Sequence, residues 1–288
     1  MKLLYRITSL ENLVSILYRH QDRFVRPIDC WEDTFEGYAL HLLDTDEGSL
    51  SVIRELYNGI CKKDYELTVR NYAKLQRARY TCYAQSWSTV KDSDAMWRIY
   101  SYGKKSVQLL SDREAMFNLI EQNSQTLGKI GKRLGEVKYD LNDNDLGSSL
   151  VQVLYPKAKV DESFFHKRSA FKHEKEQRIV LQLVERYSVM TEFITKAILN
   201  NIKHEENLSI EERILNAQKR LGNVRREVLY PWAFPKELLV EIPIPKDYIK
   251  GVRVHPQAEK WYEDLIKDIC DQSSVEFLGK SDLYRKAL

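Results

Sequence analysis

The four cysteines of the sequence are too far apart to form a metal-binding pair. They follow no Cys-x-x-Cys pattern and have no histidine beside them at ligand spacing, standing as they do at Cys30, Cys61, Cys82 and Cys270. This spacing argues against a structural zinc site and against a disulfide framework. We therefore expect four reduced thiols, most of them buried.

Motifs of several enzyme and membrane classes are also absent. The sequence has no glycine-rich phosphate-binding loop and no Gly-x-Ser-x-Gly elbow, which argues against a P-loop nucleotidase and a Ser-His-Asp hydrolase. No uncharged run reaches the length of a membrane span, and the apolar part of Met1–Arg6 is too short for a signal peptide. We therefore expect a cytoplasmic protein.

The chain has no large excess of charge of either sign. Its 45 basic and 42 acidic residues leave a net charge of +3. The net charge therefore does not indicate a nucleic acid or an anionic membrane as partner, although local basic patches can still exist. With 288 residues the chain can bury a substantial core. One large domain with insertions or two small ones would fit this length, and we favour a single domain over residues 1–288.

The order of short strands and interspersed helices predicts an α+β fold. Strands and helices do not alternate regularly enough for a doubly wound parallel sheet. Residues 188–228 are rich in lysine and glutamate, with Gly222 as a break, and we interpret them as a helical insertion within the domain. The main predicted strands are Leu3–Ile7, Arg79–Ser88, Lys105–Leu110, Ile179–Val184, Leu238–Ile242, Ile249–Val254 and Val275–Leu278, and the main predicted helices begin at Ser9, Asp92, Asp112 and Pro256.

A charged stretch, Phe171–Arg178, leads directly into the apolar and β-branched run Ile179–Val184. The run predicts a largely buried strand, so the charged residues lie at the start of this strand. We expect the carboxylates of Glu174 and Glu176 to point to opposite faces, and we assign Glu176 to the face that would meet a ligand. The alternative is a solvated strand end whose acids pair with Lys172, Lys175 or Arg178.

Four further side chains are candidates for a binding site. Arg6 lies near the end of the first predicted strand, Ser86 lies near the end of the second, and Trp97 and Tyr100 share a face of the helix that begins after Asp92. Each has a structural alternative: Arg6 can pair with an acid, Ser86 can form a hydrogen bond at the end of a strand, and the two aromatic residues can belong to the core. The acids considered for Arg6 are Asp33 and Glu36.

Several short segments, taken in this order, resemble the bacterial family catalogued as domain of unknown function 2971. They are Leu4-Tyr5-Arg6 with Ser9, Asn12-Leu13 and Ile16-Leu17, then Trp31-x-Asp33-x-Phe35-Glu36, Tyr83-x-x-Ser86, Met96-Trp97-x-x-Tyr100 and Glu174-x-Glu176-x-Arg178. The resemblance covers almost the whole chain. It departs from the family at Lys104-Lys105-Ser106, where we expect a glycine-led turn, and at residues 188–228.

The opening strand and helix are also similar to those of DarT-like and other ADP-ribosyltransferases. In the arginine, serine, glutamate class of these enzymes, an Arg on the first strand, a Ser on a middle strand and a Glu-x-Glu motif follow in that order. Arg6, Ser86 and the pair Glu174 and Glu176 have the same order here. The resemblance implies a split mixed or antiparallel sheet flanked by helices.

This resemblance also implies a reaction and a role for each candidate residue. NAD would be the substrate, and its ADP-ribose would be transferred to a macromolecule, nucleic acid or protein, by a toxin or phage-defence effector. Glu176 would be catalytic, with Glu174 orienting the acceptor. Arg6 and Ser86 would bind the NAD molecule, and Trp97 or Tyr100 would form a wall of the nicotinamide pocket.

Two other functions remain open from the sequence. A noncatalytic module on the same scaffold could bind nucleic acid or a protein through the basic residues near Arg225 and Arg226. A nuclease could hold Mg²⁺ with Asp33, Glu36 and Glu176, because hard oxygen ligands suit that ion.

Overall fold

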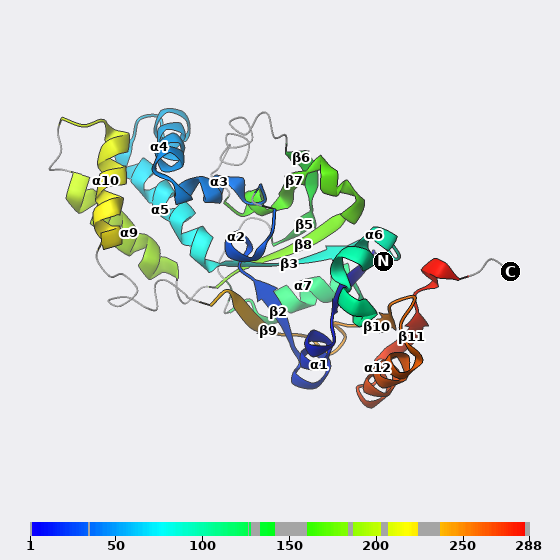
Figure 1. Cartoon of the computed structure of the whole chain (residues 1–288). Coiled ribbons are helices and arrows are strands. Elements are labelled where there is room, and N and C mark those ends of the chain that lie inside the picture. The colour runs from blue at the N-terminus through cyan, green and yellow to red at the C-terminus, as the bar shows by residue number, and fades with distance from the viewer. Residues whose placement is uncertain are drawn as a thin grey trace.

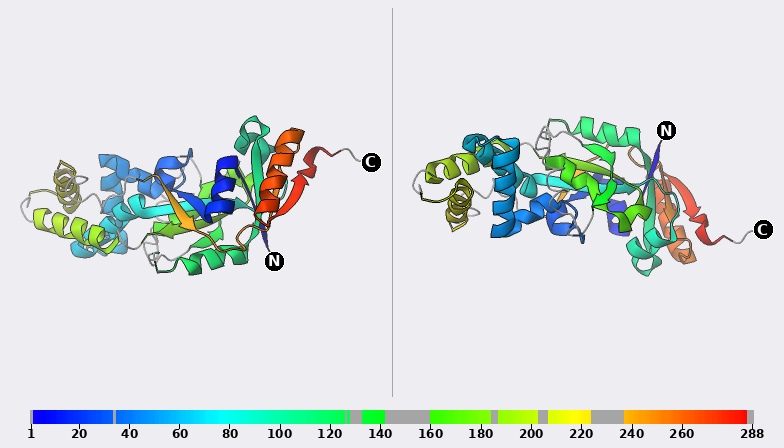
Figure 2. Two further views of the ribbon diagram at one scale, coloured as in Figure 1. Left: turned by 90° about the horizontal axis from the view of Figure 1, so that it is seen from below. Right: turned by 90° about the horizontal axis from the view of Figure 1, so that it is seen from above.

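A mixed sheet of nine strands forms the centre of the protein, in a computed structural model that describes residues 2–33, 35–125, 127, 133–141, 160–183, 187–202, 207–223 and 237–285. Helices flank this sheet (Figures 1 and 2), so the predicted α+β class is confirmed. Among these residues β10 and β11 are parallel, and the other paired strands of the sheet are antiparallel. Its strands are β1 (Leu3–Ser9), β2 (Gln21–Val25), β3 (Cys82–Ser88), β4 (Ser106–Asp112), β5 (Leu134–Glu136), β8 (Glu176–Gln182), β9 (Leu239–Pro243), β10 (Gly251–Val254) and β11 (Glu276–Lys280).

Strand β3 is the point at which the sheet divides. Along one edge it pairs with β8 over its whole length, from Cys82 to Ser88. A strand has only two edges, so β1 and β2 share the other: β1 pairs with β3 at Ser88, and β2 pairs with it at Ala84. The sheet therefore splits beside Ser86, which lies between the two contacts.

Strand β8 is buried on both faces, as its apolar sequence predicts. Val180 packs into one core cluster, and its neighbours Ile179 and Leu181 pack into the other. Side chains alternate between faces along a strand, so Glu176 and Arg178 lie on the same face as Val180. In the ladder with β3, Ser86 stands opposite Arg178 and Ser88 opposite Glu176. These four polar side chains therefore project from one face of the sheet.

The helices divide between the two core clusters. Those at the end of the molecule farthest from β11 pack together on the Val180 side, and they are α4 (Asp46–Glu55), α5 (Tyr65–Thr81), α9 (Tyr187–Asn201) and α10 (Ile210–Asn223) (Figure 1). The cluster on the other face includes residues of α1 (Leu10–Arg19), α7 (Arg113–Gln122) and α12 (Lys260–Gln272). Short helices α2 (Pro27–Cys30), α3 (Tyr38–His41) and α6 (Asp94–Tyr100) complete the described set. Among the described residues, no helix combines the length and the apolar composition needed to cross a bilayer.

Some predicted boundaries are wrong. Residues Arg79–Thr81 form the last turn of α5 rather than the start of a strand, because the helix capped by Asp64 continues to Thr81. The last helix begins at Lys260, four residues after Pro256. Gly222 lies in α10 beside Asn223, the last residue described there, so the predicted break after it falls outside the described residues. Arg225 and Arg226, which belong to the predicted insertion, lie outside the described residues.

A tight turn precedes β8 and sets the positions of the two glutamates. The 3-10 segment Ser169–Glu174 ends at Lys175, which adopts a left-handed conformation with φ 44° and ψ 55°. The Ser88 hydroxyl donates a hydrogen bond of 2.6 Å to the backbone carbonyl of Glu174, which fixes the turn against β3. This left-handed residue reverses the chain between the 3-10 segment and Glu176.

Substitutions at Lys175 test how strongly this turn is specified. Lys175→Val should lower the free energy of unfolding by about 1–2 kcal/mol, because a β-branched residue is strained at positive φ. Lys175→Gly should change it by less than about 0.5 kcal/mol, because relief of strain offsets the flexibility of glycine in the unfolded chain. Urea denaturation measures both values. Lys172→Val is the matched control at an exposed position of the same segment, and an equal loss in that variant would contradict the prediction.

Candidate active site

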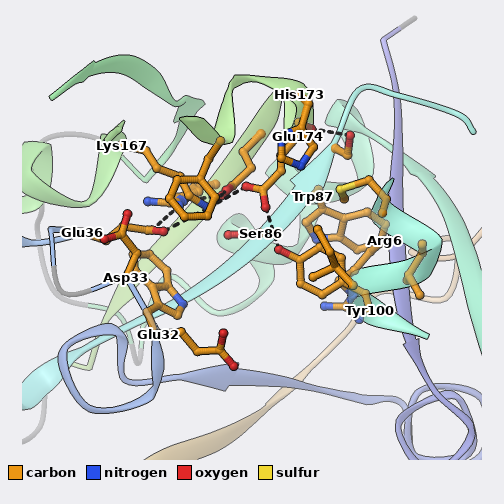
Figure 3. A pocket seen from close by; sticks show the side chains of 18 of the residues that line it. Arg6, Glu32, Asp33, Glu36, Ser86, Trp87, Tyr100, Lys167, His173 and Glu174 are labelled. Carbon is orange, nitrogen blue, oxygen red and sulfur yellow. Dashed lines mark hydrogen bonds and ion pairs between the residues drawn. The ribbon is translucent and has the colours of Figure 1, made fainter. Parts of the chain in front are cut away.

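A cavity of about 710 Å³ opens beside β3, where the sheet divides (Figure 3). Its volume falls in the range of about 300–1,000 Å³ that is common for small-molecule sites. The side chains come from β1, β3, β8, α6, the loop after α2 and the segment around the 3-10 turn, and those that matter below are Arg6, Trp31, Asp33, Glu36, Ser86, Trp87, Tyr100, Lys167, Arg168, Phe171, Glu174, Glu176 and Arg178.

Five of the six residues that the sequence singled out line this cavity, namely Arg6, Ser86, Tyr100, Glu174 and Glu176. The sixth, Trp97, is not among its lining residues. It is 1% exposed and packs edge-on against His255, with ring centroids 5.2 Å apart. The reason is helical geometry: residues four apart share a face, so Met96 and Tyr100 of α6 turn to the cavity while Trp97 turns to the core.

Lys167 stands between three carboxylates at one side of the cavity. It belongs to β7 (His166–Arg168), which pairs with β6 (Lys138–Leu141). Its Nζ atom lies 3.0 Å from Glu36 Oε1, 2.6 Å from Glu174 Oε2 and 2.7 Å from Glu176 Oε1. An ammonium group has three N–H donors, so each can serve one carboxylate.

Arg178 completes this buried ion cluster from β8. Its Nε donates to Glu176 Oε2 at 2.6 Å, its Nη1 donates to the carbonyl oxygen of Phe164 at 2.7 Å, and its Nη2 donates to Glu36 Oε2. The guanidinium also lies 4.2 Å from the ring centroid of Trp31. Each carboxylate oxygen of Glu176 is therefore bound by a different cation, which leaves this side chain little freedom to rotate.

The expectation that only one of Glu174 and Glu176 faces a ligand is wrong. Both side chains line the cavity, and both bind the Lys167 ammonium. Positions two apart on a strand share a face rather than opposing each other. Glu174, moreover, lies outside β8, in the turn before it, and the left-handed Lys175 returns its side chain towards Glu176.

The surroundings of the two glutamates separate their pKa values. Burial alone would raise the pKa of Glu176, but the charge of Arg178, an interaction with Glu174 and the charge of Lys167 outweigh it and hold this pKa well below its usual range. Burial and the neighbouring Glu176 raise the pKa of Glu174 to about 7, against the opposing effect of Lys167. At neutral pH Glu176 is therefore ionised, whereas Glu174 is close to its titration midpoint.

Tyr100 contacts Glu174 from the opposite side. Its hydroxyl donates a hydrogen bond of 2.8 Å to Glu174 Oε1, while Oε2 of the same carboxylate binds Lys167. Burial and the charge of Glu174 raise the pKa of Tyr100 well above its usual value, so the phenol stays protonated and remains a donor. Both oxygens of Glu174 thus have partners.

Arg6 lies on the other side of the cavity, above the indole of Trp87. Its Nη2 contacts both carboxylate oxygens of Asp22 at 2.8 and 2.7 Å, and its guanidinium lies 4.7 Å from the Trp87 ring centroid. Its partner is thus Asp22 rather than the acids considered from the sequence. The Nε atom is buried and has no hydrogen-bond partner among the described residues. A bound anion or hydroxyl group can therefore use donors that Asp22 leaves free.

The remaining acids considered for a metal site already have cationic partners. Asp33 Oδ1 lies 3.0 Å from Arg168 Nη2, and Glu36 and Glu176 both bind Lys167 and Arg178. Within the described part of the chain no group of His, Cys, Asp and Glu residues is arranged to hold a metal ion. Magnesium would have to displace two buried cations to reach these carboxylates.

Sequence reasoning missed Lys167 as a member of the site, and it considered Glu36 only as a partner of Arg6 or a ligand of Mg²⁺. The alternation of Glu174, Glu176 and Arg178 carried a usable signal, because alternate residues of a strand share a face and an acid there pairs readily with an arginine two positions later. Nothing local marks Lys167, since Glu36 is distant in the sequence and Glu174 and Glu176 reach the lysine only through the turn before β8.

Comparisons with known proteins give little further information. No protein-family model matches the sequence, and no curated protein matches it. Among solved structures, a DarT from Thermus sp. 2.9 in complex with ADP-ribosylated single-stranded DNA aligns with 98% of this chain and 96% of its own, at 8% identity and a TM-score of 0.36. A likeness of this size does not establish a fold or a reaction, so the site must be interpreted from its own residues.

Arg178→Met tests the contribution of the ion cluster to stability. Removing one member of a buried ion pair typically costs about 3–5 kcal/mol, because its partners stay buried and uncompensated. We expect a loss of that size in the free energy of unfolding, measured by urea denaturation at pH 7. Arg98→Met is the matched control, since Arg98 pairs with Asp94 in solvent and its loss should leave the denaturation midpoint unchanged. A loss below about 1 kcal/mol for Arg178→Met would contradict the prediction.

Proposed function

We propose that this protein is an ADP-ribosyltransferase-like enzyme that cleaves NAD and transfers the ADP-ribose to a macromolecule. The observation that supports it best is the meeting of Arg6, Ser86 and Glu176 around one cavity, although these residues are far apart in the sequence. Their types and order are those of the arginine, serine, glutamate class that the sequence resembles.

The reaction places a carboxylate where positive charge develops. The bond between the nicotinamide nitrogen and C1′ of the ribose breaks, nicotinamide leaves with the bonding electrons, and the sugar passes through a cation-like transition state. An ionised carboxylate in a site shielded from water stabilises such a charge. Glu176 is the group assigned to this task, because Arg178 and Lys167 keep it ionised at neutral pH.

Glu174 suits the acceptor side of the same reaction. A nucleophilic oxygen or nitrogen of the acceptor forms the new bond to C1′, and its proton must go to a nearby base. A carboxylate whose pKa is raised to about 7 is a suitable base near neutral pH. Nicotinamide leaves as a neutral molecule, so its departure needs no general acid.

Arg6 and the aromatic walls suit the rest of the NAD molecule. The guanidinium offers donors in a fixed fork for a phosphate or a ribose hydroxyl. Ser86 lies opposite Arg178 in the ladder, beside the split in the sheet, where it can donate to the ribose or to Glu176. Trp31, Trp87 and Tyr100 supply flat surfaces for the nicotinamide or adenine ring.

The proposal leaves the class of acceptor open. The DarT named above was solved with modified single-stranded DNA, but its similarity to this chain is too low to assign the same acceptor. The role as a toxin or a phage-defence effector, which the sequence resemblance implies, belongs to the proposal, as does the cytoplasmic location expected from the sequence.

Labelled NAD provides the direct test. Wild-type protein, incubated with plausible acceptors, should release nicotinamide, and Glu176→Gln should reduce kcat by about 10²-fold or more through loss of the ionised group. Ser86→Ala should reduce kcat/KM by about 10- to 100-fold, because one hydrogen bond to a charged group contributes about 1.5–3 kcal/mol.

Two controls separate loss of chemistry from loss of folding. Glu121→Gln removes an exposed carboxylate on α7 and should leave turnover unchanged. Circular dichroism and thermal unfolding report whether Glu176→Gln folds, and Ser86→Ala gives a second readout at a position outside the ion cluster. Equal nicotinamide release by wild type and Glu176→Gln, or no release with any acceptor, would reject the proposal.

The pH dependence of turnover tests the role of Glu174. The base is active when ionised, so kcat/KM for nicotinamide release should rise about tenfold per pH unit below pH 7 and level off above it. Glu174→Gln should remove this rise and lower the plateau. A profile that keeps its rise in the folded Glu174→Gln variant would assign the titration to another group.

A further inference from the structure

We propose that Lys167 is a positioning residue of this site, the shared counter-ion that holds Glu174 and Glu176 side by side and keeps both available in their charged forms. This inference rests on the proposed function for its consequence in catalysis. The geometry that supports it, however, can be tested without turnover.

Lys167 is the cationic partner that Glu174 has among the described residues. Within the described structure Arg178 pairs with Glu176 and Glu36 but not with Glu174, whose other partner is the neutral hydroxyl of Tyr100. Glu176 remains bound to Arg178 if Lys167 is removed, whereas Glu174 is left beside a like charge with no cation. Two carboxylates that share a buried site cannot both stay ionised without compensation.

The contacts also fix the distance between the two carboxylates. Because one nitrogen atom binds Glu174 at 2.6 Å and Glu176 at 2.7 Å, their bonded oxygens can be no farther apart than the two bonds laid end to end. The 6% exposed side chain of Lys167 cannot be replaced by a water-borne cation without opening the cluster. Glu36, at 3.0 Å, occupies the third direction around the same ammonium group.

The surroundings of Lys167 hold it at this point. Its ammonium lies 4.4 Å from the ring centroid of Phe171, which belongs to the 3-10 segment that ends at Glu174. The backbone position of Lys167 is set by β7, in which the next residue, Arg168, pairs with Asp33. An arginine at position 167 would keep the charge, but its donors are spread over a larger planar group, so it cannot hold three carboxylates around a single nitrogen atom.

Other charged and titratable groups around Glu174 do not replace this function. The elements packed against it contribute Tyr100 from α6, Tyr139 from β6, Glu176 and Arg178 from β8, and Glu36 from the loop before α3. Two of these are acids, which oppose ionisation of Glu174. The tyrosines are neutral, because burial raises the pKa of Tyr139 to about 12 and that of Tyr100 still higher. Arg178 already donates hydrogen bonds to Glu176, to Glu36 and to the carbonyl oxygen of Phe164.

The first test measures the titration of Glu174 itself. Full-length protein with ¹³C-labelled glutamate carboxyls is titrated by NMR, and the Glu174 signal is assigned by its absence in Glu174→Gln. Lys167→Met should move the Glu174 midpoint upward by more than about one pH unit, since a charge contact of this kind shifts a carboxyl by about 1–3 units. Lys172→Met removes an exposed lysine of the same segment and should leave the midpoint unchanged. An unchanged midpoint in Lys167→Met would overturn the proposal, whether or not the protein turns over NAD.

The second test uses turnover and a variant that keeps the charge. In Lys167→Arg the pH profile of nicotinamide release should keep its midpoint near that of wild type, while kcat falls about tenfold or more with little change in KM, because orientation is lost while charge remains. An unchanged kcat in Lys167→Arg would also overturn the proposal. The Lys167→Arg variant also provides the test of the proposal if Lys167→Met fails to fold. Absence of turnover in wild type would reject the proposed function alone, since the NMR titration still decides the role of Lys167.

Discussion

The site depends on one electrostatic arrangement, the buried cluster in which Lys167 and Arg178 are shared by Glu36, Glu174 and Glu176. Its members come from four segments that are distant or separated by turns, so the cluster forms only in the folded chain. Three carboxylates against two cations leave one negative charge in excess when all are ionised. Because burying an unpaired charge is costly, this excess falls on the member with the weakest compensation, and that member is Glu174.

The divided sheet explains why this cluster meets a cavity rather than a closed core. Ladder pairing places Ser86 and Ser88 opposite Arg178 and Glu176, so β3 and β8 present one polar face. On the other edge of β3, β1 and β2 diverge, which removes a neighbouring strand where Ser86 lies. Arg6 on β1 and Trp87 on β3 line the cavity beside this gap. The position of the site therefore follows from the topology, and the ion cluster supplies its chemistry.

Much of the local structure was predictable because it depends on neighbours in sequence. The Ser9 cap of α1, the Ser93 cap of α6 and the apolar residues Ile179–Leu181 of β8 each encode their element within a few residues. Predictions failed where two local preferences compete, as at Arg79–Thr81, whose alternation suits a strand but which continue a long helix. The expectation of opposite faces for Glu174 and Glu176 was wrong because residues two apart on a strand share a face, and the left-handed turn at Lys175 could not be predicted from a lysine.

The partners of Lys167 were not predictable for a physical reason that also bears on its role. A lysine is usually solvated, and burying one is unfavourable unless several anions compensate for its lost hydration. Here the compensation is provided by Glu36, which is distant in the sequence, and by Glu174 and Glu176, which the turn before β8 brings to the lysine, so no simple sequence pattern reveals it. An arrangement of this kind is costly for stability, since an apolar side chain of similar volume often packs as well or better. The feature that an apolar residue at this position could not reproduce is a pair of carboxylates held together and charged beside an open cavity.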